Sequence, residues 1–212
     1  SQPDVRIYMQ CVKVAGEVVA PSKVVCVGRN YVAHIEELGN EVPDQMVVFI
    51  KPNSAIGDIL RSQVGGEELH YEGELAFAVS GGELAAVGFG LDLTKRSLQG
   101  RLKEKGLPWE RAKAFDGAAL FSEFVPLPAE PGRLSLQLVV DDHMRQSGGV
   151  ELMMYKPATI LNELGTFITL EDGDIIMTGT PAGVGAIRTG ERFEGHVLCE
   201  GETLVTAAWV AQ

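Results

Sequence analysis

Two glutamates separated by a single glycine are the strongest chemical signal in this sequence. Glu72 and Glu74 lie in an otherwise apolar segment, LHYEGELAFAV. Residues two apart on a β-strand send their side chains to the same face, so the two carboxylates lie close together. Their negative charges repel unless a positive group lies between them, and a hard divalent cation is the simplest such group. The pair therefore predicts a metal-dependent enzyme.

The same pair also has a simpler explanation. Strands with one solvated face often carry glutamates there, and Glu67 and Glu68 would suit an acidic surface turn. Asp92 favours the metal site instead, because it follows the apolar run AAVGFGL at residues 85–91, which has the pattern of a neighbouring strand. Three carboxylates could then converge on one ion.

A histidine and a glutamate form a second candidate group, in the segment GRNYVAHIEEL. His34 and Glu37 are three residues apart and share one face of a predicted helix, where the carboxylate can raise the basicity of the imidazole. A solvated surface pair has the same spacing. A buried strand and Gly28 precede this helix, however, and such turns commonly carry active-site residues. We interpret the pair as a general-base dyad.

A glycine-rich segment, TGTPAGVG at residues 178–185, follows the predicted strand DIIM. Its glycines and threonines can offer backbone N–H groups and hydroxyls to an anion such as a carboxylate. The lysine of a phosphate-binding loop is absent and no helical pattern follows, which disfavours a nucleotide. A plain glycine-rich turn is the alternative.

Strand patterns outnumber helix patterns around these groups, which predicts an α+β fold that is mainly β. A hairpin over residues 5–14 and 17–20 would turn at Ala15 and Gly16. Further strands are predicted at residues 24–27, 46–50, 75–80, 84–91, 133–141, 174–178 and 203–210. Helices are predicted at residues 31–38, capped by Asn30, at 95–105, capped by Thr94, and at 157–164.

Composition limits the possible partners and location. The chain has 212 residues, 45% of them hydrophobic, which is enough to bury the core of one domain. Its 18 basic and 29 acidic residues give a net charge of −11, which disfavours nucleic acid and anionic membranes as partners. No apolar run approaches a membrane span, and no signal pattern opens the chain. Three cysteines without metal-ligand spacing indicate reduced thiols and a cytoplasmic protein.

Six segments in order, from about residue 22 to about residue 200, resemble the fumarylacetoacetate hydrolase family. The similarity is greatest to its small single-domain members, the acylpyruvate hydrolases and oxaloacetate tautomerases. The segments are VGRNYVAHIEELG, FIKPNSAI, LHYEGELAFAV, GFGLDLTKRSLQ, KGLPWERAKAFDG and GDIIMTGTPAGVG. The resemblance implies a mixed β-sandwich roll, usually a homodimer, with a catalytic domain over residues 22–212 after an N-terminal hairpin segment over residues 1–21.

The resemblance also implies roles for individual residues. It assigns a Mg²⁺ or Mn²⁺ ion to Glu72, Glu74 and Asp92. It assigns catalysis to His34, Glu37 and Lys113. It assigns contacts with a small anionic 2-oxo acid to Arg29, Lys51, Arg96, Gln99 and Thr180.

The sequence departs from the family pattern near these residues. Tyr71 stands where the family often has histidine, and Ser97 where it often has a further aspartate. The segment DDHMRQ at residues 141–146 replaces a more usual Asn-Gly turn, although Arg145 and Gln146 are retained. No ligand is lost, but the side chains around a metal choose among related keto acids, so substrate preference stays open.

The implied activity is hydrolysis of a C–C bond in short 2,4-dioxo acids, such as fumarylpyruvate or acetylpyruvate, to pyruvate and a carboxylic acid. A metal-stabilised enolate is common to this reaction and to its alternatives. These alternatives are tautomerisation or decarboxylation of oxaloacetate, and a 2-hydroxyhepta-2,4-diene-1,7-dioate isomerase type of activity. A non-catalytic ligand-binding homologue is a third hypothesis, which the chemically competent residues at every expected position disfavour.

Overall fold

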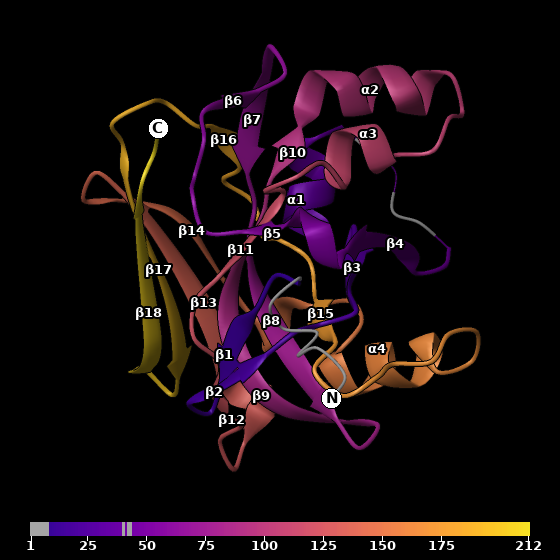
Figure 1. The fold of residues 1–212 in the computed structure, drawn as a ribbon, viewed down its shortest axis with the longest axis vertical. Coiled ribbons are helices and arrows are strands. Elements are labelled where there is room, and N and C mark those ends of the chain that lie inside the picture. Colours follow the sequence, from indigo (N-terminus) through magenta and orange to yellow (C-terminus); the bar gives the residue numbers. More distant parts are fainter. Residues whose placement is uncertain (1–8, 40, 42–43) are drawn as a thin grey trace, which may run out of the picture.

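A long mixed sheet forms the centre of the computed structural model, which describes residues 9–39, 41 and 44–212 (Figure 1). Its strands are β3 (Lys23–Gly28), β4 (Val47–Pro52), β5 (Ile56–Gly57), β8 (Gly73–Ser80), β9 (Glu83–Asp92), β11 (Ala119–Phe121), β12 (Val125–Pro126) and β15 (Ile175–Met177). The strand order is β4-β3-β15-β8-β9-β11-β5, with β12 also paired to β9. The pairs β3/β15 and β5/β11 are parallel, and the others are antiparallel.

A second, antiparallel sheet packs against β8 and β9. It contains β13 (Leu134–Val140), β14 (His143–Gly149), β17 (Arg192–Cys199) and β18 (Glu202–Val210), in the order β14-β13-β17-β18. Alternation along β8 and β9 points Leu75 and Phe89 into the apolar core between the sheets, where Phe193 of β17 joins them. A Cβ atom on Gly195 would lie only 2.2 Å from the ring of Phe89, so glycine permits this close approach.

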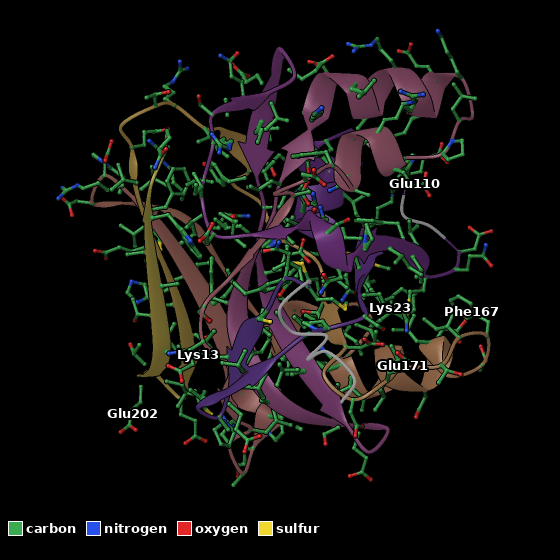
Figure 2. All side chains as sticks on the ribbon, viewed as in Figure 1. Lys13, Lys23, Glu110, Phe167, Glu171 and Glu202 are labelled. Carbon is green, nitrogen blue, oxygen red and sulfur yellow. The ribbon has the colours of Figure 1, made fainter. Side chains whose placement is uncertain are left out.

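Smaller sheets and the helices surround this sandwich. The remaining strands are β1 (Val12–Val14), β2 (Glu17–Val19), β6 (Gln63–Val64), β7 (Glu67–Tyr71), β10 (Thr94–Lys95) and β16 (Gly185–Ala186). The helices are α1 (Val32–Glu37), α2 (Arg96–Glu104), α3 (Glu110–Lys113) and α4 (Pro157–Leu164), with 3-10 turns at Asn53–Ala55, Pro131–Arg133 and Val150–Leu152. Helices α2 and α3 lie together at one end of the molecule, and α4 lies near the other end (Figure 1). Side chains fill the spaces between the ribbons (Figure 2).

The structure confirms an α+β fold that is mainly β and built as a sandwich. The predicted hairpin turns at Ala15 and Gly16, although residues 5–8 of its first strand lie outside the described residues. The three predicted helices are present, α4 with the predicted bounds and α1 and α2 one residue shorter at each end, and α3 was not predicted. The domain boundary after residue 21, the homodimer and the cytoplasmic location stay predictions. Within the described part of the chain, no helix is both long and apolar enough to cross a membrane.

Both predicted helix caps are wrong. The cap positions belong to Tyr31 and Lys95, and neither side chain forms a capping hydrogen bond. Asn30 instead donates from Nδ2 to the carbonyl oxygen of Thr178 at 2.8 Å, which ties the start of α1 to the end of β15. The Thr94 hydroxyl donates a hydrogen bond to Glu72 Oε2 at 3.1 Å. Tertiary contacts therefore take both side chains away from the local hydrogen bonds that their types favour.

Candidate metal centre and active site

The three predicted carboxylates meet where β8 begins and β9 ends. Glu74 lies opposite Gly90 in the antiparallel register, and the carbonyl oxygen of Glu72 accepts a hydrogen bond of 2.9 Å from the backbone N–H of Asp92. Strand alternation then turns all three side chains to the face opposite Leu75 and Phe89. One oxygen of each carboxylate lies within 4.8 Å of the others, and all three residues are buried. The register of two neighbouring strands thus builds the cluster.

Burial and mutual repulsion act differently on two members of this cluster. Burial raises the pKa of Glu74 well above its ordinary value, and the negative charges of Asp92 and Glu72 raise it further. Burial also opposes ionisation of Glu72, but the positive charges of Lys113 and Arg96 outweigh it and lower the pKa of Glu72. Without further positive charge, burial and repulsion therefore oppose ionisation of Glu74 within the cluster.

Lys51 lies beneath Asp92 and is completely buried. Its ammonium lies 2.8 Å from Asp92 Oδ1 and donates hydrogen bonds to the carbonyl oxygens of Leu93, Lys113 and Ala118. These three carbonyls occupy the three N–H donors of the ammonium. Asp92 Oδ1 is consequently buried without a hydrogen bond from any described residue. Lys51 is placed to position Asp92 and does not line the cavity described below.

Lys113 and Arg96 approach the cluster from the helices. The Lys113 ammonium donates to Asp92 Oδ2 at 3.0 Å, Glu72 Oε2 at 3.2 Å and Thr94 Oγ1 at 2.7 Å. Burial lowers its pKa, but the charges of Asp92 and Glu72 outweigh burial, and the pKa of Lys113 is raised. Arg96 donates from Nη2 to Glu72 Oε2 at 2.6 Å. Both cations therefore neutralise part of the negative charge of the carboxylate cluster.

The donor set fits a divalent cation such as Mg²⁺ or Mn²⁺. All three candidate ligands are carboxylates, the oxygen donors that hard cations prefer. Asp92 Oδ1 lies against the Lys51 ammonium but accepts no hydrogen bond from the described residues, and burial and repulsion within the cluster raise the pKa of Glu74. Both features suit a site that an added cation would stabilise. Glu72, Glu74 and Asp92 are therefore the residues that would hold such an ion.

The predicted dyad forms on α1. His34 Nδ1 lies 3.1 Å from Glu37 Oε2, and both carboxylate oxygens of Glu37 accept from the backbone N–H of Gly183, at 3.0 and 3.1 Å. Gly183 has a φ of +105°, and a Cβ there would lie 1.9 Å from the carbonyl oxygen of Arg145. Only glycine fits this position, which connects the dyad to the glycine-rich segment.

The glycine-rich segment also supports the carboxylate cluster. The Gly179 N–H donates to Glu74 Oε1 at 2.8 Å, so the carboxylate that it binds belongs to the protein itself. The Thr180 hydroxyl donates to the carbonyl oxygen of Gly73 at 2.8 Å and accepts from Gln146 Nε2 at 2.7 Å. Thr180 therefore holds the turn before β8, and its contact with a substrate stays a prediction.

One cavity joins Glu72 and Asp92 of the cluster, His34 of the dyad and α2, whereas Glu74 and Glu37 lie behind its lining. Its volume is about 40 Å³, which is room for roughly three waters or a few atoms of a small acid. The predicted residues that line it are Arg29, His34, Glu72, Asp92, Arg96, Gln99, Lys113 and Thr180. The lining also includes Phe49, Lys103 and Trp109, which sequence reasoning missed.

Two of the missed residues had a detectable signal. Lys103 follows Gln99 by four residues and Arg96 by seven, so it lies on the same face of α2. Trp109 lies in the segment KGLPWERAKAFDG, which the family resemblance had already marked. Thr94, which also contacts Glu72, was interpreted only as a helix cap.

Comparison with known proteins agrees with this geometry. Residues 23–208 match the family model for the C-terminal part of fumarylacetoacetate hydrolase. An oxaloacetate tautomerase from Escherichia coli K12 is 38% identical over 200 residues, covering 84% of this chain and 90% of the relative.

Two solved structures are also similar. A fumarylacetoacetate isomerase/hydrolase candidate from Oleispira antarctica has a TM-score of 0.90 and 33% identity, covering 96% of this chain and 100% of that chain. A fumarylpyruvate hydrolase from Pseudomonas aeruginosa, solved with Mn²⁺ and pyruvate, has a TM-score of 0.86 and 29% identity. This match covers 100% of this chain and 99% of that chain. Fold, site and sequence agree, and the chain belongs to the fumarylacetoacetate hydrolase family of enzymes as a small, single-domain member.

Proposed function

We propose that this enzyme uses a divalent cation to catalyse keto–enol tautomerisation of oxaloacetate. The observation that carries the proposal is the buried cluster of Glu72, Glu74 and Asp92 at the base of a small cavity lined with cations. The similarity to an oxaloacetate tautomerase over 84% of the chain supports this choice of substrate. In the proposal, the three carboxylates hold Mg²⁺ or Mn²⁺. When bound, the ion supplies positive charge that stabilises negative charge on a 2-oxo acid.

In the proposal, residues around the cluster accept and donate the protons. Tautomerisation removes one proton from the enol hydroxyl and adds one to the adjacent carbon, so it needs a base and an acid. Glu37 occupies Nδ1 of His34, which leaves Nε2 to accept the proton. Lys113 is held protonated by its carboxylate neighbours and can deliver a proton. Arg96 and Gln99 line the cavity and can hold a substrate carboxylate.

Hydrolysis of acylpyruvates is the second candidate, and the His34–Glu37 dyad favours it. An imidazole held by a carboxylate can remove a proton from water, which then adds to the distal carbonyl of the substrate. The C–C bond breaks, its electron pair passes to the pyruvate fragment, and that fragment takes up a proton. The Mn²⁺- and pyruvate-bound fumarylpyruvate hydrolase of similar fold supports this alternative.

A paired assay tests the proposal and ranks the two reactions. Loss of the enol absorbance of oxaloacetate and cleavage of acetylpyruvate would be followed with purified protein in Mg²⁺, after exhaustive chelation, and after Mg²⁺ is restored. We expect both activities to disappear on chelation and to return with the metal, with tautomerisation the faster. Activity that survives chelation would reject the metal role, and faster acetylpyruvate cleavage would reverse the order.

A further inference from the structure

Two cations in the cavity lack a carboxylate partner. Arg96 and Lys113 bind Glu72, and Lys113 also binds Asp92. Arg29 and Lys103 line the same cavity, but neither forms an ion pair with another described residue. The whole chain carries a net charge of −11, so carboxylates are abundant elsewhere. Leaving two cations unpaired in one cavity is thus a local property of the site.

Lys103 is held in place by an aromatic ring. Its ammonium lies 5.1 Å from the ring centroid of Trp109, a cation–π distance. Burial lowers the pKa of Lys103 to about 8, and the positive charges of Arg29, Arg96 and Lys113 contribute to this shift. These neighbours make the ammonium costly in this cavity, and a bound anion would relieve that cost.

Arg29 is held in an unfavourable backbone conformation. Its φ is +55°, in the left-handed region, which for a residue other than glycine costs on the order of 1 kcal/mol. Its Nε is buried and has no hydrogen-bond acceptor among the described residues. A guanidinium readily binds a carboxylate through two parallel hydrogen bonds. Both the strain and the unused donor are accounted for if Arg29 binds an anion.

We propose that Arg29 and Lys103 bind the second carboxylate of a dicarboxylate substrate. The inference rests on the proposed function, in which the 2-oxo acid end of the substrate lies at Glu72, Glu74 and Asp92. The other end of the substrate then faces the unpaired cations of the same cavity. The site would therefore select 2-oxo diacids over 2-oxo monoacids of equal length, because only the diacid neutralises Arg29 and Lys103.

A matched pair of ligands tests this selectivity by binding alone. 2-Oxoglutarate and 2-oxopentanoate have the same chain length and differ only in the terminal carboxylate. Calorimetric titration in Mg²⁺ should show the wild-type protein binding the diacid at least about 10-fold more tightly than the monoacid. Lys103→Met keeps an apolar chain beside Trp109 and removes the charge, so the ratio of diacid to monoacid affinity should fall about 10-fold or more.

Three further variants keep the test decisive. Lys103→Arg should retain most of the preference for the diacid, and Arg29→Gln should lose it as Lys103→Met does. Lys105→Met removes an exposed charge just after α2 and should leave the ratio unchanged. An equal loss for both ligands in Lys103→Met and Arg29→Gln, or a wild-type protein that does not prefer the diacid, would overturn the inference.

Turnover separates this inference from the proposed function. For oxaloacetate, Lys103→Met should raise KM about 10-fold or more with little change in kcat, because Lys103 would bind the distal carboxylate equally in the ground state and the transition state. If the wild-type protein prefers the diacid in binding but turns over neither oxaloacetate nor acetylpyruvate, the proposed reaction fails and the inference holds. If it turns over both without that preference, the reaction holds and the inference fails.

Discussion

The two sides of the cavity are built in different ways. We call Glu72, Glu74, Asp92, Lys51 and Lys113 the carboxylate base, and Arg29, His34 and Lys103 the helical wall. The carboxylate base is buried, and its core is set by the register of β8 and β9. The helical wall comes from α2, α1 and the turn before α1, and two of its three residues lack a carboxylate partner within the described part of the chain. In the proposed function, the carboxylate base would serve the enolate chemistry and the helical wall would set the substrate preference.

Loss of a predicted ligand in the carboxylate base should have the largest effect. Glu74→Gln keeps the shape of the side chain but removes one negative charge from the proposed metal site. A bound cation contributes several kcal/mol to catalysis, so kcat/KM should fall by roughly 10⁴-fold. The affinity for Mg²⁺ should fall as well. Kinetics would measure the fall in kcat/KM, and Mg²⁺ titration would measure the fall in affinity.

Glu202→Gln is the matched control for this variant. Glu202 is exposed on β18, far from α2 and α3 (Figure 2), and its replacement should change neither quantity. Wild-type Mg²⁺ affinity in Glu74→Gln would remove this residue from the proposed metal site.

Loss of the buried cation beneath the base should act on stability. Lys51→Met leaves Asp92 and three carbonyl oxygens without their ammonium partner. Breaking such a buried contact costs about 4 kcal/mol, which urea unfolding would detect. Lys13→Met is the control, because Lys13 is exposed on the hairpin of β1 and β2 (Figure 2). Equal stability of both variants would contradict the positioning role of Lys51.

Loss of the histidine in the helical wall should separate acylpyruvate cleavage from oxaloacetate decarboxylation. His34→Gln removes the proposed base and should lower acylpyruvate cleavage by roughly 100-fold, because that reaction requires activated water. Decarboxylation of oxaloacetate requires no activated water and should fall much less. Mg²⁺ affinity should not change, since His34 is outside the carboxylate base. Equal losses in cleavage and decarboxylation would contradict this division of roles.

The smallest expected effect is a pH dependence of the metal-free protein. The raised pKa of Glu74 means that the folded protein keeps a proton that the unfolded chain releases. The free energy of unfolding in chelator should therefore fall as pH rises from the ordinary glutamate pKa toward the raised value. Glu74→Gln should abolish this fall, and saturating Mg²⁺ should oppose it. A wild-type protein whose stability rises over this pH range would contradict the assigned direction.

More of the carboxylate base than of the helical wall could be predicted from the sequence. Strand spacing alone placed Glu72 and Glu74 on one face, and the next apolar run brought Asp92 beside them. Lys113 required the family resemblance, because it ends a four-residue helix with no periodic pattern. Lys51 looked like a substrate contact, since no local pattern reveals that three carbonyl oxygens from distant segments surround its ammonium.

The helical wall depends on how separate elements come together. The sequence indicated His34 and Glu37 as neighbours on a helix, but not that Gly183 would hold Glu37. Lys103 shares a helical face with Arg96, yet only the packing of α2 against Trp109 brings it to the cavity. β17 was missed for a similar reason, because the buried position at Gly195 is a glycine that only the close approach of Phe89 explains.

Anomalous diffraction from crystals soaked in Mn²⁺ tests the central claim most directly, because it locates the cation independently of activity. The account predicts a single strong peak in the cavity, within ligand distance of one oxygen from each of Glu72, Glu74 and Asp92. The same crystals of Glu74→Gln should show a weaker peak or none. A wild-type cluster that stays empty at saturating Mn²⁺, or a peak bound to other residues, would contradict the account.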